Sequence, residues 1–384
     1  MPHNADIYAG YLVDGSGEPF KERIHIRIKN GFIDQVEPAD PAILEKPGIT
    51  DLSRKTVLPS LVDAHVHLFM SGTTDPKARQ RQLDAGFDET AATIAENLEK
   101  HRSCGIGAVR DAGDRNGRTL CFKKNRGRDL KVALHAAGAG WHALGRYGKL
   151  IARSPSKNET LAQAILKKSK NADHVKIIHS GLNSLTTFSK ETPPQFDLCE
   201  MKQAVAAAKA LNLEIMVHSN GKLPTEIALD AGCRSIEHGF FMGALNLKKM
   251  ADAQVTWVPT VCPMNSHYEH LLDTGQPVDV VLRTLEHQLN QMRMARELGV
   301  RVAMGTDAGS PGADHGTSMT KEFKLFLAAG FRVEEAVKAA TLNGARLMGL
   351  TGSGRVAKGM TANIIAVPGS PSDLPDTFDR VECL

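Results

Sequence analysis

The chain has 384 residues, more than the roughly 250 of a typical single β/α barrel, so there is room for a second, smaller module. Its 47 lysines and arginines against 43 aspartates and glutamates leave a formal net charge of +4. This small excess is spread along the chain without a basic block, which argues against nucleic acid or a membrane surface as a partner. No stretch approaches the roughly 18 uninterrupted apolar residues of a membrane span, and no signal peptide is visible.

The six cysteines are isolated from one another and form no CxxC pair. Isolated thiols of this kind are typical of proteins kept in a reducing compartment, so they predict a cytoplasmic location. Composition therefore favours a soluble intracellular enzyme. The sequence does not fix the oligomeric state, and a homo-oligomer, with a dimer as the simplest form, is left open.

The two ends of the chain differ from its middle. Short segments that alternate apolar and polar side chains, with turn sequences between them, occupy residues 5–15, 22–38 and 49–59. That pattern predicts a small antiparallel unit. After Gly352 the chain returns to strand-like character. We therefore expect residues 1–56 and 355–384 to form one composite β-sandwich domain beside a larger domain of residues 57–354.

From Leu58 onward, apolar strand-like runs alternate with stretches of helical periodicity. The predicted strands lie within residues 57–67, 107–113, 131–138, 174–181, 213–220, 234–239, 254–260 and 300–309. The predicted helices lie near residues 90–102, 161–170, 201–212, 224–231, 278–298, 321–329 and 333–347. This alternation favours an α/β fold with a parallel sheet inside a layer of helices. Eight such strands predict a (β/α)8 TIM barrel.

Side chains of metal-ligand type end several of these strands: His65, His67, Lys176, His218, His238 and Asp307. His65 and His67 are two residues apart on one strand, so both point to the same side and can share an ion. Taken alone, an HxH pair also fits core packing. Because the ligands come from at least five strands, only a closed barrel aims them at one point. Catalytic residues collect at the C-terminal ends of barrel strands, which predicts a metal-dependent hydrolase.

These motifs resemble the amidohydrolase superfamily over nearly the whole chain. The resemblance is carried by LPSLVDAHVHL, DHVKII, VHS, SIEHG and GTDAG, and by TLNGARLMGL and GRVAKGMTANIIAV near the end. The segments VRDAG, SIEHG, WVPT and GTDAG are most similar to imidazolonepropionase-like and Xaa-Pro dipeptidase-like members. The resemblance implies the TIM barrel, the binuclear metal branch of the family and a hydrolytic reaction.

The resemblance also implies a role for each ligand. His65, His67 and Asp307 would hold the more buried of two divalent metal ions, and His218 and His238 the more exposed one. Imidazole nitrogen and carboxylate oxygen are ligands that suit zinc.

Lys176 would bridge the two metals after N6-carboxylation by carbon dioxide. A plain lysine ammonium would repel a dication, whereas the carbamate is an anion with one oxygen for each metal. A hydroxide bridging the metals would attack the C–N bond. Asp307 would then relay the proton to the leaving nitrogen.

Other polar residues that follow barrel strands are candidates for catalysis or substrate binding. His142 matches in position a family histidine after the third strand and would polarise the substrate carbonyl or bind a carboxylate. An ordinary loop hydrogen bond is equally open for it, and Trp141 stands where relatives carry glycine. Arg110 would bind a substrate carboxylate or pair with its neighbour Asp111.

Four further candidates for substrate binding come from loops. His179 follows Lys176 where relatives often carry small residues, so it is a candidate for specificity. His267 and Tyr268 follow the seventh strand as lid candidates, and His315 lies in the loop after the eighth. Simple exposure of His179 and a helix-terminal role for the segment of His315 are left open.

The expected reaction is hydrolysis of an amide, peptide or cyclic amide bond in a small molecule. Deamination of a heterocycle is an alternative, but deaminases of the superfamily usually lack the lysine bridge and carry HxxE after the fifth strand. Here Gly221 stands at the position of that glutamate. Hydrolysis of a lactone or organophosphate on the same centre is also open. A non-catalytic binding protein is remote, because such proteins typically lose ligands that this chain retains.

Overall fold

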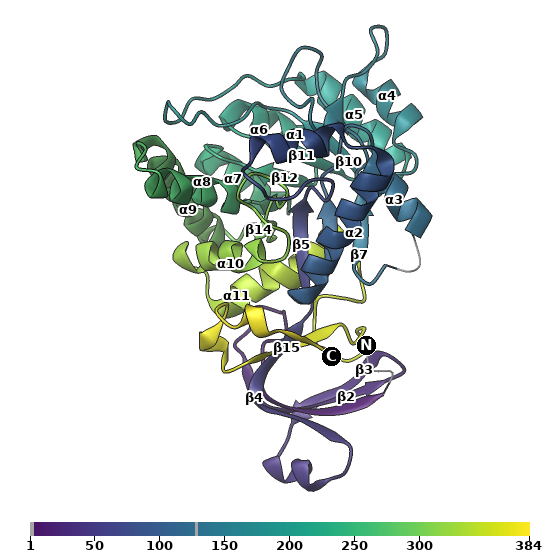
Figure 1. Ribbon diagram of the computed structural model, residues 1–384, viewed down its shortest axis with the longest axis vertical. Helices are drawn as coiled ribbons and strands as arrows, with labels where there is room; N and C mark the ends of the chain where they lie inside the picture. Colours follow the sequence, from purple (N-terminus) through teal and green to yellow (C-terminus); the bar gives the residue numbers. More distant parts are fainter. Residues whose placement is uncertain (1–3, 127–129) are drawn as a thin grey trace.

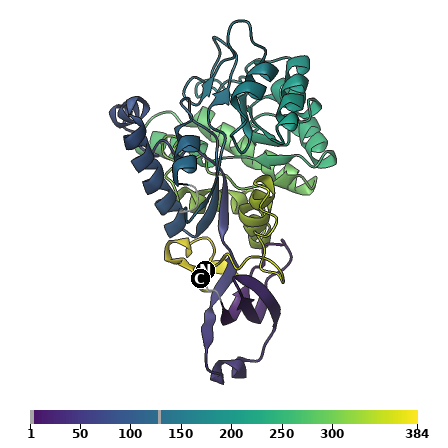
Figure 2. The ribbon, with the colours of Figure 1, turned by 90° about the vertical axis from the view of Figure 1, so that its right-hand side faces the viewer.

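The computed structural model describes residues 4–126 and 130–384. A barrel of parallel strands wrapped by helices forms the larger part, and a twisted sheet lies beneath it (Figure 1). Figure 2 shows the same division from the side, with the purple N-terminal strands and the yellow C-terminal segment meeting below the barrel. The expected fold class, a TIM barrel with a small β-sandwich built from both chain ends, is confirmed.

The barrel strands follow the expected runs closely. They are β5 (Leu61–Val66), β6 (Ile106–Asp111), β7 (Ala133–Ala136), β10 (Val175–Ile178), β11 (Ile215–Ser219), β12 (Ser235–His238), β13 (Thr256–Val258) and β14 (Arg301–Val302). After β7 the chain continues into β8 (Gly140–Trp141), which pairs in parallel with β10 and with β9 (Ala152–Arg153). The third barrel strand is therefore interrupted.

Backbone hydrogen bonds close the ring at both breaks in the strand pairing. The Asp307 N–H donates to the His65 carbonyl at 2.8 Å, so the chain after β14 lies against β5. On the other side, the Asp173 N–H donates to the Ala136 carbonyl at 3.1 Å, which joins the end of β7 to the start of β10. Closure brings the C-terminal ends of all barrel strands to one face.

Helices cover the outside of the barrel, and those that pack on the strands bury an apolar stripe against them. In α9, for example, Val281, Leu285 and Met292 are buried at helical spacing. The helices are α1 (Pro76–Asp84), α2 (Phe87–Ser103), α3 (Arg118–Arg126), α4 (Leu161–Lys168), α5 (Leu198–Ala210), α6 (Lys222–Asp230), α7 (Gly243–Asp252), α8 (Cys262–Asp273), α9 (Asp279–Glu297), α10 (Ser318–Ala328), α11 (Val333–Lys338) and α12 (Gly344–Leu347). None within the described residues has both the length and the hydropathy needed to cross a lipid bilayer.

Six strands from the two ends of the chain form one sheet in the order β16-β15-β4-β1-β2-β3. They are β1 (Ala5–Leu12), β2 (Lys21–Lys29), β3 (Phe32–Pro38), β4 (Ile49–Pro59), β15 (Ile364–Pro368) and β16 (Glu382–Cys383). Ile24, Ile26 and Ile28 alternate along β2 and are all buried in the core of this sheet. The C-terminal strand β15 pairs antiparallel with β4, as expected for a composite unit.

The sheet differs from the expected antiparallel unit in one pairing. Strand β4 lies parallel to β1, because the connection through residues 39–48 returns the chain to the far side of β1. A β-hairpin would have placed β4 beside β3 instead. The sheet is therefore mixed.

Candidate metal centre and cavity

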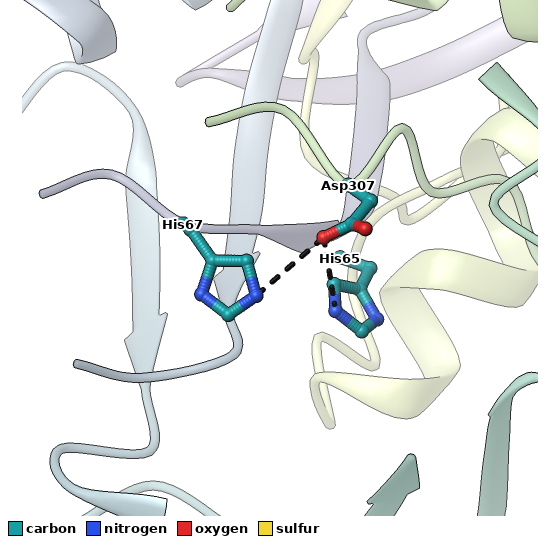
Figure 3. Close-up of side chains that lie close together, drawn as sticks. All are labelled: His65, His67 and Asp307. Atoms are coloured by element: carbon teal, nitrogen blue, oxygen red, sulfur yellow. Dashed lines mark ion pairs between the residues drawn. The ribbon is translucent and has the colours of Figure 1, made fainter. Parts of the chain in front are cut away.

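Three expected ligands form a compact group at the C-terminal end of the barrel (Figure 3). His65 and His67 come from β5 and the residue that follows it, and Asp307 comes from the loop after β14. The Asp307 Oδ1 lies 3.6 Å from His65 Nε2 and 3.5 Å from His67 Nε2. One ligand atom of each residue lies within 4.8 Å of the others, a spacing that suits a metal ion.

Both histidines of this group are held in a tautomer that leaves Nε2 free. The Nδ1 of His65 is 2.6 Å from Glu237 Oε2, and the Nδ1 of His67 is 2.9 Å from the Gly113 carbonyl oxygen. A carboxylate and a carbonyl are acceptors, so Nδ1 carries the proton in each ring. The lone pair at Nε2 is then available to a metal, as in most histidine ligands with an oriented second nitrogen.

His218 and His238 also have one ring nitrogen hydrogen-bonded and the other free, although in His218 the free nitrogen is Nδ1. The His238 Nδ1 donates to Thr260 Oγ1 at 2.6 Å, because that hydroxyl already donates to the Pro259 carbonyl. The His218 Nε2 lies 3.2 Å from the Gly181 carbonyl, which leaves its Nδ1 as the free nitrogen. The ring centroids of the two histidines are 4.6 Å apart, and those of His238 and His65 are 5.0 Å apart.

Lys176 lies inside this group, two residues before the end of β10. Its side chain is 1% exposed, and its Nζ makes no hydrogen bond. Burial lowers the pKa of Lys176 to about 8, although the Glu237 and Asp307 carboxylates favour the charged form. A lysine with so low a pKa has an appreciable neutral fraction, and only the neutral amine reacts with carbon dioxide.

Burial also keeps the four imidazoles neutral. It lowers the pKa of His67 and of His218 to about 3 and holds those of His65 and His238 well below their usual range. Neutral imidazole is the form that binds metals. In contrast, burial raises the pKa of Asp307 to about 7, against the lowering effect of the Lys176 amine.

The backbone is strained where two of these ligands emerge. His238 has φ 67°, Asp307 has φ 53°, and Thr260, which holds His238, has φ 46°. Residues other than glycine seldom adopt this left-handed conformation, which costs on the order of 1–3 kcal/mol where it occurs. Strain of this kind clusters at functional sites, because the surrounding structure must hold a side chain in an exact direction.

A cavity of about 470 Å³ opens above the group. Its lining includes His67, Lys176, His218, His238 and Asp307, whereas His65 lies fully buried beneath. Much of the remaining lining is apolar: Phe69, Met70, Leu150, Ile151, Leu182, Leu185, Phe240, Pro263, Met264 and Pro311. A cavity of this size and lining suits a small molecule with a bulky apolar part.

Arg79, on α1, brings a positive charge to the cavity wall. Its Nη1 donates to the carbonyls of Ser71, Thr73 and Gly309 at 3.1–3.3 Å. Among the described residues, no carboxylate forms an ion pair with Arg79. The Asp307 carboxylate acts on it only through a longer-range electrostatic interaction. Arg79 was missed by sequence reasoning because α1 carries no buried residue and so has no apolar stripe to reveal it.

Arg110 differs from both expectations for it. Its side chain is 2% exposed inside the barrel, where Nη1 donates to Glu237 Oε1 at 3.3 Å and Nη2 to Ser235 Oγ at 3.0 Å. It therefore neither lines the cavity nor pairs with Asp111, whose oxygens accept the backbone N–H groups of Leu68 and Gly113 instead.

Of the other expected substrate residues, only His267 lies on the cavity lining. His142 is buried beside Ser154, with Nε2 3.2 Å from its hydroxyl, and His179 is buried and stacked on Phe196. Tyr268 packs against the barrel core from α8. These positions give no support to a direct role in binding substrate.

His315 is also buried away from the cavity. Its Nε2 donates to the Met70 carbonyl at 2.8 Å, and its Nδ1 lies 3.0 Å from His101 Nε2. His315 Nδ1 accepts from His101 Nε2 in this contact, so the His315 ring is neutral, and burial holds the pKa of His101 well below its usual range. Burial lowers the pKa of His315 to about 4, consistent with this arrangement. His315 thus joins the loop after β14 to α2.

Glu237 is the residue of the site that sequence reasoning missed although a pattern indicated it. Ser235 and Glu237 are two residues apart on β12, so both side chains point to the same side of that strand. A glutamate in the SIEH strand cannot face the apolar helix layer, so it must point into the barrel, where His65 and Arg110 also point.

Comparison with known proteins identifies the family of the chain. The amidohydrolase family model matches residues 56–381, so the chain belongs to the amidohydrolase family. Ochratoxinase from Aspergillus niger is 25% identical over 95% of this chain and 81% of the relative. Imidazolonepropionase from Porphyromonas gingivalis is 22% identical over 83% of this chain and 76% of the relative.

Solved structures share the fold over the full length. A Xaa-Pro dipeptidase with bound methionine in its active site has a TM-score of 0.79 at 25% identity, and the match covers 99% of this chain and 97% of that one. The resemblance to imidazolonepropionase-like and Xaa-Pro dipeptidase-like hydrolases is therefore confirmed.

Proposed function

We propose that this chain is a metal-dependent hydrolase that cleaves the C–N bond of an amide, peptide or cyclic amide. The observation that carries the proposal is the donor set at the cavity. Four neutral imidazoles each have one nitrogen hydrogen-bonded and the other free, beside a carboxylate and a buried amine without a partner. Relatives named ochratoxinase, imidazolonepropionase and Xaa-Pro dipeptidase support hydrolysis at C–N bonds.

The residues present fit two divalent metal ions, which we take to be zinc. His65, His67 and Asp307 would hold one ion, His218 and His238 the other, and carboxylated Lys176 would lie between them. The orphaned His65 Nε2 and Lys176 Nζ support this assignment, since buried polar atoms are rarely left without a partner. When bound, a metal pair acidifies a water molecule and polarises the scissile carbonyl.

The chain itself supplies proton transfer and substrate binding. Asp307 would accept the proton of the attacking water and deliver it to the leaving nitrogen. Its Oδ2 is oriented by the Ser310 hydroxyl at 3.0 Å. Arg79 would bind a carboxylate of the substrate, and the apolar lining around Leu150 and Leu182 would exclude water and hold an apolar side chain.

The position of Gly221 argues against a deaminase. Its φ is 86°, and a Cβ there would lie 2.7 Å from the Glu191 Oε2. The glutamate expected in a deaminase of this superfamily would be strained at such a position. Release of a carboxylate and an amine is therefore the expected outcome, with lactones and organophosphates as comparison substrates.

We also propose a cytoplasmic enzyme that acts on a small molecule, without nucleic acid or membrane as a partner. The six cysteines are free, and four of them lie on or near the surface. A homo-oligomer is compatible with this proposal. We further propose that the boundaries between the two domains lie near residues 56 and 355.

Metal analysis of the purified protein tests the proposal. We expect close to two zinc-type ions per chain in the wild type and a loss of both metal and activity in Lys176→Ala. Short carboxylic acids should restore part of the activity, because they replace the carbamate oxygens. One ion with an unmodified lysine would place the chain in the single-metal branch. Strong ammonia release from aminopurines, with no turnover of peptides, lactams or lactones, would contradict the reaction itself.

A further inference from the structure

A buried polar connection crosses the interior of the barrel below the candidate metal centre. It runs from Arg110 on β6 to Glu237 on β12 and on to His65 on β5. Arg110 is 2% exposed, and Glu237 and His65 are fully buried. Ser235 joins it, with its hydroxyl 2.7 Å from Glu237 Oε1 and 3.0 Å from Arg110 Nη2.

The two oxygens of Glu237 have different partners. Oε1 accepts from the Arg110 guanidinium at 3.3 Å and from the Ser235 hydroxyl at 2.7 Å. Oε2 accepts only from His65 Nδ1, at 2.6 Å. The carboxylate is therefore fixed from one side, and its remaining oxygen holds a ring whose other nitrogen, Nε2, has no partner.

Stability alone does not account for this arrangement. Burying an ion pair in a barrel carries a large desolvation cost for each ion, and apolar residues of similar volume often stabilise a protein as well or better. Apolar residues share this inward face on the neighbouring strands: Met216 lies opposite Ser235, and Val258 lies opposite Glu237. The ion pair of Arg110 and Glu237 can orient His65, and a pair of apolar residues could not.

We infer that Glu237 is a positioning residue for the metal centre, and that Arg110 and Ser235 hold Glu237 in place. By accepting the Nδ1 proton of His65, Glu237 fixes the tautomer and the ring orientation and makes Nε2 a stronger donor to a metal. This inference rests on the proposed function, because it concerns the affinity of the same centre for its metal. It also converts Arg110 from an expected substrate ligand into a support of the centre.

Metal affinity of Glu237→Gln tests the inference. Glutamine keeps the size of the side chain and an acceptor oxygen but removes the charge, so we expect zinc to bind about 10–100-fold more weakly in competition with a chelator. Asp14→Asn is the control, because it removes a buried carboxylate that pairs with Lys21 in the terminal sheet, away from the barrel. Its affinity should equal that of the wild type. An unchanged affinity in Glu237→Gln would overturn the inference.

A double variant separates positioning from stability. Glu237→Gln alone leaves the Arg110 charge buried without a partner, which could prevent folding. Combining Arg110→Met with Glu237→Gln removes that charge, so we expect thermal stability to recover towards wild type while zinc affinity stays low. If affinity recovered together with stability, Glu237 would have only a structural role.

The metal-free protein provides a measurement that does not depend on the proposed function. With ¹⁵N-labelled histidine, the His65 Nδ1–H should give a downfield ring proton in the wild type that moves upfield in Glu237→Gln. Absence of that resonance in the wild type would overturn the inference, even if the protein binds zinc. A wild type that shows the resonance but binds no metal would contradict the proposed function and confine Glu237 to orienting His65.

Discussion

Asp307 presents its two oxygens to different neighbours. Oδ1 lies 3.5–3.6 Å from the free nitrogens of His65 and His67, and Oδ2 accepts the Ser310 hydroxyl at 3.0 Å. A carboxylate in this position can bind a metal and still carry a proton. Burial raises its pKa to about 7 in the absence of metal, which shows how poorly water solvates it.

Asp307→Asn should therefore separate binding from turnover. We expect kcat to fall by at least about a hundredfold, the usual scale for loss of a general acid–base, with KM within a few-fold of wild type. The amide oxygen can still reach a metal, but the amide cannot carry the proton. Steady-state kinetics on a peptide or lactam would measure this. A raised KM with an unchanged kcat would show that Asp307 serves binding alone.

Arg79 should select substrates that carry a free carboxylate. A hydrogen bond to a charged group contributes about 1.5–3 kcal/mol, so Arg79→Met should lower kcat/KM for such substrates by about 13- to 160-fold. The same substrates with the carboxylate capped as an amide are the control and should be affected little. Equal losses for both would mean that Arg79 acts only by holding the carbonyls of Ser71, Thr73 and Gly309.

The candidate ligands could be picked out from sequence because each lies at or near the C-terminal end of an apolar run. Once the barrel was predicted, His218 and His238 could be proposed as ligands without further knowledge of the three-dimensional structure. Arg79 and Arg110 could not be assigned in this way, because the partner of a long flexible side chain depends on three-dimensional neighbours. Arg110 turns inward to Glu237, 127 residues further along the chain.

Helices α1 and α8 could not be predicted from the periodicity of the sequence. Both contribute to the cavity, through Arg79 and through His267. Helix α1 buries no side chain, and α8 buries only Cys262 and Ser266. A helix that lies over an open cavity lacks the apolar stripe by which amphipathic helices are recognised. Helices that pack on strands, such as α5 and α9, were predicted close to their observed bounds.

Helix α2 is tied to the loop after β14 by the neutral pair His101 and His315, and this contact should make stability depend on pH. Burial lowers the pKa of His315 from 6.5 to about 4 in the folded state. Between these values the unfolded chain takes up a proton that the folded chain does not, so stability falls as pH falls from 6.5 to about 4. The slope is at most about 1.4 kcal/mol per pH unit for one group.

His315→Gln should flatten that dependence. We expect the free energy of unfolding of the metal-free variant, from urea titrations between pH 4 and 6.5, to change less with pH than that of the wild type. Its stability at neutral pH should be lower, because the bond to the Met70 carbonyl is lost. His270→Gln, at an exposed position of α8, controls for the exchange of a histidine for glutamine. An unchanged slope in His315→Gln would contradict the argument.

At the scale of the whole molecule, the terminal sheet and the barrel are connected directly from one strand to the next. Strand β4 of the terminal sheet is followed by Ser60 and then directly by β5 of the barrel, which carries His65 (Figure 1). The composite nature of the sheet could be predicted from the change of periodicity at both ends of the chain. The parallel pairing of β1 with β4 could not, because the connecting residues 39–48 carry no periodic pattern that fixes its direction.

Removal of residues 355–384 should therefore affect more than the terminal sheet. We expect a chain that stops at residue 354 to aggregate, because β15 is absent and the edge of β4 is left unpaired. A chain that lacks only residues 382–384 is the control, since β16 is a short and exposed edge strand. Recovery in the soluble fraction and circular dichroism would compare the two. A folded, monomeric product ending at residue 354 would show that the barrel domain is independent.

The pairing of β4 with β15 also sets an order of events during synthesis. The Thr56 hydroxyl donates to the Gly369 carbonyl, 313 residues further along the chain. A ribosome that adds about 5–20 residues per second needs about 15–60 s to cover that distance. Throughout this interval β4 has β1 on one side and no neighbour on the other. The nascent chain must carry an open, apolar sheet edge through the whole synthesis of the barrel, so we expect chaperone contacts to concentrate on its first 60 residues.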